Sequence, residues 1–508
     1  MINLIKNELY KIFHKKFIYV MAILIIGLRI ATNVIINATA NIDLLWIYEP
    51  SVKELEDSDI STMSKDTLQY LVSDKNQYDG LVILKENKYG NNSWQAEIIL
   101  NGVINENIAC MNNSKYIDKN TEEYDKCKAE FDKNMEYIKN DDWEHFVKAD
   151  LEEAKAQKEF LLNPVVQENE IDEISEEEGL NIVQSEEETE EEDEEEEIIS
   201  LSSIEARIKA DEYRLEYGIP FDYSVKSTIL YDYQSYSDMW DHVQHDDNTI
   251  TKHASLVEKK NIEKNYYETK YKVENNVLPK TNGSTTSQEY VINSFTYAST
   301  FMIILVVVLG ATVTADEFNK GTIKQLLLKP YTRTKILVSK YISCLIVFLL
   351  FVLGSVLVYS VIDGISFGFK DLFIPVVEYN FNTGKVMEIN TFVYILINLL
   401  SILPHYIILF TLGFLISVLA ENSVVGIIVP LVFDTFGSLI TELIPKSLAK
   451  VSAFFPTNCW ELNQFLFGGL ADNQYVTLGK SLFVDIILLA LMIFLSIRIF
   501  KKKDIKNQ

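Results

Sequence analysis

The chain lacks the motifs by which proteins bind nucleotides or catalytic metals. Its 508 residues include only four cysteines and six histidines, and their spacing forms neither a zinc site nor an HExxH helix. No Walker A loop is present, because the nearest string, QYVTLGKS at 474–481, lacks the first glycine and does not follow a predicted strand. We therefore expect no catalytic residue, no metal site and no cofactor in this chain, and we expect that it is not an enzyme.

Long apolar runs are what the chain has instead. A helix needs about 20 mainly apolar residues to cross the hydrocarbon core of a bilayer. Six runs approach this length, which predicts an all-α polytopic membrane protein with six transmembrane helices. The expected spans are 17–39, 292–315, 341–362, 391–418, 423–443 and 481–500. The first run lacks a small-residue cleavage pattern, so we expect an uncleaved anchor rather than a signal peptide.

Charge divides the chain into two parts. Residues 40–291 hold 59 of the 73 acidic residues and only 25 of the 46 basic ones. Basic residues outside this range cluster before the first span, between the second and third spans, and at the tail 501–508. Because basic flanks favour the cytoplasmic side, we expect a multi-pass cell-membrane protein with both termini in the cytoplasm. Residues 40–291 then form an acidic extracytoplasmic domain.

The composition of this outer domain predicts an α-rich fold with a small β element, an α+β arrangement. Residues 121–162 have helical periodicity, whereas 78–85 and 95–100 have the composition of strands. The Glu-rich stretch 164–199, with the run EEETEEEDEEEE, has too few apolar residues for a core, so we interpret it as disordered. A cation site is the alternative interpretation of the same charges.

Two shorter segments are expected at the membrane surfaces. Residues 1–16 place apolar side chains at helical spacing with lysines between them, which predicts an amphipathic helix along the cytoplasmic interface. A plain cytoplasmic lead into the first span is the alternative. Residues 444–480 are partly apolar but broken by proline and glycine, which predicts short helices on the outer side. Cys110 and Cys127 of the outer domain form either a disulfide or two free thiols.

The most specific segment is the predicted cytoplasmic loop 316–340, which begins DEFNKGTIKQLLLKPYTR. A short helix is expected after Gly321, and Pro330 would end it. The apolar side chains of that helix would be exposed unless a partner covered them, so the loop is a candidate contact site for another protein. A loop held on the lipid surface by anionic headgroups is the alternative.

This loop resembles the one between the second and third spans of type-2 ABC exporter permeases, the transmembrane subunits of ABC-2 transporters. Their six helices, N-terminal elbow helix and short outer helices before the last span are similar to residues 1–39 and 292–508. The resemblance implies a coupling helix that fits a groove on a separate ATPase subunit, which would bind ATP and Mg. The implied coupling residues are Glu317, Gly321, Thr322, Ile323, Lys324, Leu326, Leu327, Pro330 and Arg333.

The resemblance also implies a function and a set of partners. The expected complex contains ABC ATPase subunits with a second permease copy or a related permease, lies in the lipid bilayer and binds no nucleic acid. It would export an amphipathic substrate, such as an antimicrobial peptide, a lipid or a lipophilic drug. Two alternatives stay open: a sensing or immunity complex, whose outer domain binds an antimicrobial peptide with little net transport, and ion extrusion.

Polar residues inside the expected spans are a second group of candidates, because ionisable groups are costly in a membrane and often functional. Arg29 and Asn33 share one face of the first span. Under the expected topology Arg29, His405 and Asp434 fall at a similar depth. We expect an ion pair between Arg29 and Asp434, within reach of His405. The pair either fixes helix packing or lies on a substrate or ion pathway.

Overall fold

The computed structural model describes residues 1–39, 43–162, 200–245, 254–281, 283–297, 299–319, 321 and 331–502. Within these ranges the chain is almost entirely helical, and six helices are long and apolar enough to cross a membrane. They comprise Lys16–Ile36, Phe301–Asn319, Arg333–Phe367, Thr391–Ala420, Ser423–Thr441 and Leu478–Lys502. The prediction of an all-α membrane protein is confirmed at this level. The Glu-rich stretch 164–199 lies outside the described residues.

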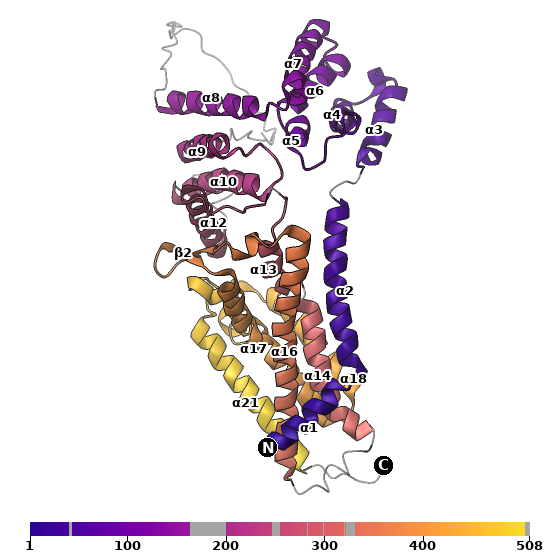
Figure 1. The fold of residues 1–508 in the computed structure, drawn as a ribbon, viewed down its shortest axis with the longest axis vertical. Coiled ribbons are helices and arrows are strands. Elements are labelled where there is room, and N and C mark those ends of the chain that lie inside the picture. The colour runs from indigo at the N-terminus through magenta and orange to yellow at the C-terminus, as the bar shows by residue number, and fades with distance from the viewer. Residues whose placement is uncertain are drawn as a thin grey trace, which may run out of the picture.

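The elements follow one another along the chain in three groups (Figure 1). The first group is α1 (Ile2–Phe13) and α2 (Lys16–Thr39). The insert that follows contains α3 (Leu45–Asp57), a 3₁₀ turn (Ile60–Thr62), α4 (Lys65–Asn87), α5 (Trp94–Leu100), α6 (Val103–Tyr116), α7 (Thr121–Lys139), α8 (Trp143–Leu162), α9 (Leu201–Tyr217), α10 (Val225–His245) and α12 (Leu256–Glu274). The third group is α13 (Ser287–Tyr297), α14 (Ser299–Asn319), α16 (Arg333–Phe367), η2 (Asp371–Phe373), β1 (Val376–Asn380), β2 (Lys385–Ile389), α17 (Thr391–Ala420), α18 (Ser423–Glu442), η3 (Lys446–Leu448), α19 (Ala449–Ser452), α20 (Pro456–Cys459), η4 (Leu462–Gly468) and α21 (Leu478–Lys502).

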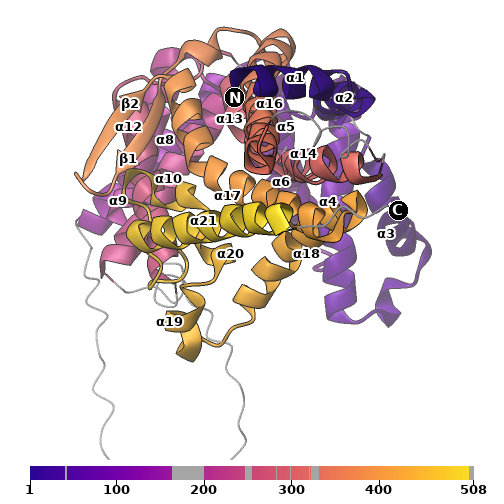
Figure 2. The ribbon, with the colours of Figure 1, turned by 90° about the horizontal axis from the view of Figure 1, so that it is seen from below.

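Helix α17 lies at the centre of the six-helix bundle and packs against α14, α18 and α21, whereas α2 packs against α16 at one side (Figures 1 and 2). Glycine allows the close approach of the inner helices. A Cβ atom at Gly310 would lie 2.5 Å from the carbonyl oxygen of Phe410, and one at Gly413 would lie 3.1 Å from that of Gly426. Small residues have this role wherever membrane helices pack tightly. The outer helices α2, α18 and α21 leave much of their apolar surface exposed, as contact with lipid requires.

Several span boundaries differ from those expected. The segment predicted as one span at 292–315 is divided between α13 and α14, and its membrane-spanning part begins at Phe301. Helix α16 begins at Arg333 rather than at 341, because the hydroxyl oxygen of Thr332 accepts the backbone N–H of Lys335 at 3.4 Å and caps the helix there. Apolar composition marks the part of a helix in the bilayer, while capping sets its end.

The insert consists of two helical lobes that lie above the bundle in Figure 1, the first on the right and the second on the left. The first lobe, α3 to α7, has a core that includes Ile99, Ile104 and Ile108. The second lobe, α9 to α12, is centred on Leu230. Helix α8 packs against α9 while Phe146 contributes to the core of the first lobe, so α8 connects the two lobes.

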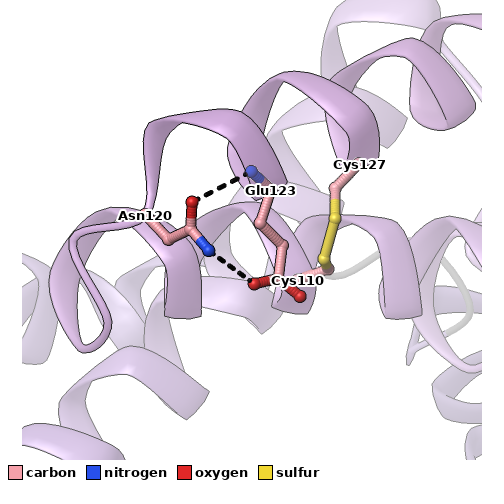
Figure 3. The surroundings of a disulfide bond; sticks show 4 residues. All are labelled: Cys110, Asn120, Glu123 and Cys127. Carbon is pink, nitrogen blue, oxygen red and sulfur yellow. Dashed lines mark hydrogen bonds between the residues drawn. A yellow bond between two sulfur atoms is a disulfide. The ribbon is translucent and has the colours of Figure 1, made fainter.

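A disulfide joins α6 to α7 in the first lobe. The structure links Cys110 to Cys127, with their Cα atoms 6.1 Å apart, and so favours the bonded form of the two expectations (Figure 3). The start of α7 is fixed beside it, because Oδ1 of Asn120 accepts the backbone N–H of Glu123 at 3.3 Å and its Nδ2 donates to that glutamate's Oε2 at 3.1 Å. Cap and disulfide together hold the α6–α7 hairpin.

The predicted β element of the insert is wrong: the described part of the insert contains no strand. Residues 78–85 lie inside α4, which begins at its Ser64 cap and ends at Lys88 in the left-handed conformation. Residues 95–100 belong to α5, whose start is capped by Ser93. A short apolar run has the same composition in a strand and in a buried helix, and here the caps decide. The antiparallel strands β1 and β2, paired from Val376 with Ile389, instead lie between α16 and α17.

Candidate functional site

The predicted coupling segment lies between the end of α14 at Asn319 and the start of α16 at Arg333. The structure describes Glu317 in α14, Gly321 with a φ of +67°, and Arg333, whose guanidinium donates to the carbonyl oxygen of Lys501 at 3.3 Å. The other predicted coupling residues lie outside the described residues: Thr322, Ile323, Lys324, Leu326, Leu327 and Pro330. The described residues show how the two ends of the segment are held.

Both ends are held by a cluster of four charged side chains, which we call the junction cluster. Lys340 of α16 lies between two carboxylates, with Nζ 2.9 Å from Oε2 of Glu8 in α1 and 2.6 Å from Oε1 of Glu317 in α14. Lys11 of α1 pairs with the same two acids, at 2.8 Å from Glu8 and 3.1 Å from Glu317. Only 1% of the Lys340 side chain is exposed. Buried charges must be paired in this way to be tolerated.

The electrostatics of the cluster favour the charged forms of Glu8 and Lys11. Burial alone would raise the pKa of Glu8, but Lys340 and Lys11 outweigh burial and lower it. Burial would likewise lower the pKa of Lys11, yet its two glutamate partners raise it. A further pair, Lys15 with Asp316 at 2.7 Å, extends the contact between the start of the chain and α14. The amphipathic helix α1 is thus bonded to both helices that flank the coupling segment, as the view from below shows for α16 (Figure 2).

Glu8 and Lys340 are not among the predicted site residues, although the sequence holds a signal for each. Glu8 is the single acid of α1 and lies on the same face as the buried Leu4 and Ile12. An acid on the apolar face of a basic helix becomes buried when that face packs, so it needs a cation beside it. Lys340 is one of the basic residues of the predicted loop and directly precedes the apolar run 341–362.

The expected ion pair between Arg29 and Asp434 is wrong. Arg29 pairs with Asp363 of α16, with Nε 2.8 Å from Oδ1 and Nη2 2.5 Å from Oδ2. Asn33 donates to the same carboxylate at 3.0 Å, and the guanidinium lies 4.9 Å from the ring centre of Tyr290. The Asp363 side chain is completely buried. Equal depth in the membrane did not identify the partner, because α2 packs mainly against α16.

His405 and Asp434 do lie together. Nε2 of His405 is 2.8 Å from Oδ1 of Asp434, and the imidazole is stacked on Trp460 of the short-helix segment with ring centres 4.5 Å apart. Asp485 of α21 is also buried, and neither of its carboxylate oxygens has a hydrogen-bond partner in the described structure. The polar candidates therefore form separate pairs, Arg29 with Asp363 and His405 with Asp434.

A separate contact connects the insert to the bundle through the hairpin β1–β2. Lys264 of α12 forms an ion pair with Glu378 of β1, and Oε1 of Glu268 accepts the backbone N–H of Tyr379 at 2.8 Å. The rings of Tyr267 and Tyr379 are stacked with centres 4.8 Å apart. Burial raises the pKa of Glu268 to about 7, since Lys264 offsets it only in part. The second lobe thus rests on the chain that joins α16 to α17.

A match to a known family covers the part of the chain that begins within α12. Residues 258–506 match a family described as "Protein of unknown function (DUF2705)". A relative from Bacillus subtilis (strain 168), "Uncharacterized protein YhcI", is 27% identical over 237 residues, which is 47% of this chain and 74% of the relative. No solved structure matches the chain. The family match thus includes the hairpin contact, the coupling segment and five of the six candidate spans, and leaves out α1, α2 and most of the insert.

Proposed function

We propose that the chain is the membrane-spanning permease subunit of an ATP-binding cassette exporter of the type-2 class. In this proposal both termini are cytoplasmic, the insert is extracytoplasmic, and α1 is the elbow helix on the inner membrane surface. Separate ATPase subunits bind ATP and Mg and contact residues 316–340. A second permease copy or a related permease completes the path for an amphipathic substrate: an antimicrobial peptide, a lipid or a lipophilic drug.

The observation that supports the proposal most is the junction cluster. A segment that transmits force needs rigid attachment at both ends. Here Lys340 of α16 forms ion pairs with Glu317, close to the end of α14, and with Glu8 of α1. Breaking a buried pair of this kind costs about 3–5 kcal/mol. A displacement of the segment would therefore move α14, α16 and α1 together instead of being absorbed at the helix ends.

The decisive experiment changes the predicted contact surface and leaves the cluster intact. We expect the double substitution Leu326→Asp and Leu327→Asp to abolish substrate-stimulated ATP hydrolysis when the chain is purified with its ATPase partner. The matched control places the same two charges at Leu161 and Leu162, which are exposed at the end of α8. Full stimulation in the first variant, with normal assembly, would contradict the coupling role.

A second function, sensing or immunity with little net transport, is favoured by the contact between α12 and β1. That contact gives the insert a direct mechanical connection to α16 and α17. Removal of residues 43–281 separates the two functions. An exporter that takes substrate from the membrane keeps substrate-stimulated ATP hydrolysis without the insert, whereas a receptor loses its response to ligand. Ion extrusion now depends on His405 and Asp434, since Arg29 is held by Asp363.

A further inference from the structure

An apolar groove of about 280 Å³ lies where the end of α1 and the first half of α2 face α16, and we call it the α2–α16 groove. Its lining residues include Phe13, Ala22, Ile25, Phe351, Gly354 and Val358. Ser355, the polar residue of the lining, donates its hydroxyl group to the carbonyl oxygen of Val352 at 2.7 Å and offers no free donor. A ligand that fits this groove must therefore be apolar where it contacts the wall.

Two polar contacts hold α1 and α2 against α16, and the groove lies between them. On one side of it Arg29 of α2 pairs with Asp363, and on the other Glu8 of α1 pairs with Lys340. Between these contacts Gly354 has no side chain, and a Cβ atom built there would meet no neighbouring atom within 4 Å. The groove is therefore open space between two fixed points, at the edge of the bundle where α2 lies (Figure 1).

The groove lies at the depth of the acyl chains of one leaflet. Both α2 and α16 are among the six helices that are long and apolar enough to cross a membrane. At about 1.5 Å per residue, Ala22 and Ile25 lie about 9 and 14 Å along α2 from its start at Lys16, whereas Phe13 lies at the corner between α1 and α2. The hydrocarbon core is about 30 Å thick, so the groove extends from the membrane surface toward its centre. Membrane lipids are the molecules that surround a protein at this depth.

Two lysines near the Phe13 end of the groove form no ion pair with a described residue. Lys16 begins α2, three residues after Phe13, and Lys6 shares the Phe13 face of α1 because the two are seven residues apart. Both side chains are exposed. Lys11 and Lys15 differ from them, because each is paired with a carboxylate of α14. The ammonium groups of Lys6 and Lys16 therefore favour an anionic headgroup at this end of the groove.

We propose that the α2–α16 groove binds one anionic phospholipid, with an acyl chain in the groove and the phosphate beside Lys6 and Lys16. The other candidate occupant is a helix of a second copy of the chain. A helix about 10 Å across would fill 280 Å³ in less than one turn of 5.4 Å, so the groove is too small to seat one. A two-fold contact through this corner would also bring the same lysines together. Because lipid tails are as apolar as the wall, selectivity comes from the headgroup charge.

The test is native mass spectrometry of the full chain in detergent micelles that contain equal amounts of two lipids. The lipids are palmitoyl-oleoyl phosphatidylglycerol and palmitoyl-oleoyl phosphatidylcholine, which share their acyl chains and differ in headgroup charge. We expect one retained phosphatidylglycerol per chain, at a preference of at least about fivefold, since each lysine near an anionic headgroup contributes about fivefold. No ATPase is present, so the outcome does not depend on the proposed export function.

Filling the groove tests the place of the acyl chain. Gly354→Leu puts a side chain into the open space and should lower the retention of phosphatidylglycerol at least fivefold. Leu353→Phe is the matched control, because it enlarges an exposed neighbour on the same helix outside the lining, and it should leave retention unchanged.

Neutralising the two lysines tests the place of the phosphate. Lys6→Gln with Lys16→Gln should reduce the preference for phosphatidylglycerol to less than twofold. Lys53→Gln with Lys148→Gln, at exposed positions of the insert, should keep the full preference. If Gly354→Leu does not fold, the preference of the wild-type chain and its loss in the lysine variant still decide. Equal retention of the two lipids, an unchanged preference without the lysines, or a dimer that retains no lipid would overturn the proposal.

Discussion

Replacing Lys340 by methionine tests whether the junction cluster holds the base of the bundle. Methionine keeps the approximate length of the side chain and removes its charge, so Glu8 and Glu317 lose the cation at 2.9 and 2.6 Å. Removing one partner from a buried pair costs about 3–5 kcal/mol. Lys11 remains, but 46% of its side chain is exposed, and solvent screens such a charge. We therefore expect a loss of about 3 kcal/mol in the free energy of unfolding.

The assay is reversible denaturant unfolding in mixed micelles, followed by circular dichroism. Lys335→Met is the matched control, since Lys335 is exposed on the same helix, and its effect should stay within about 0.5 kcal/mol. Neutralising Lys340, Glu8 and Glu317 together should recover most of the lost stability, because no buried charge is then left unpaired and the charge of Lys11, whose side chain is 46% exposed, is solvated. A loss below about 1 kcal/mol for Lys340→Met, or a triple variant no more stable than the single one, would refute the reasoning.

Three further outcomes follow from the other buried groups. Arg29→Met should lower the free energy of unfolding by about 3–5 kcal/mol. Exchanging the charges, as Arg29→Asp with Asp363→Arg, should restore part of that loss when it is measured by denaturant unfolding. No recovery in the exchanged variant would argue against this pair. Asp485→Asn should lower the free energy of unfolding by less than about 1 kcal/mol in the same assay, because its carboxylate has no hydrogen-bond partner among the described residues to lose. A larger loss would contradict this reading of the site. The pKa of Glu268 is higher in the folded chain, so its contribution to the free energy of unfolding should fall as pH rises from about 4.5 to about 7 and then level off. Glu268→Gln should flatten this part of the measured pH profile. An unchanged slope in the variant would count against the raised pKa.

The membrane-spanning helices could be predicted because apolar length is a property of each segment alone. The run at 391–418 needed no knowledge of its neighbours to be identified, and α17 covers it. The helical character of 121–162 was likewise visible in its own periodicity, and α7 and α8 lie there. Residues 78–85 show the limit of this approach, since their composition fits two structures and only the flanking Ser64 cap distinguishes them.

Pairing between helices could not be predicted in the same way. The depth of Arg29 in the membrane follows from the sequence, but several helices pass that depth. Arg29 pairs with Asp363 rather than Asp434 because of how the helices pack. His405 was expected within reach of Asp434 because of its depth, and the two do lie together. They belong to consecutive helices joined by a short turn, which are usually neighbours. Lys340 lies more than 300 residues from Glu8, so nothing local indicated their contact.

The most direct measurement of the central claim is photocrosslinking from the coupling segment in native membranes. A benzophenone amino acid at position 327 should yield, after irradiation and mass spectrometry, an adduct with a protein that contains a Walker A motif. The same amino acid at position 162 on the insert should not. If position 327 reacts only with lipid, or becomes accessible to a membrane-impermeant reagent added outside intact cells, the segment does not contact an ATPase and the proposed coupling is wrong.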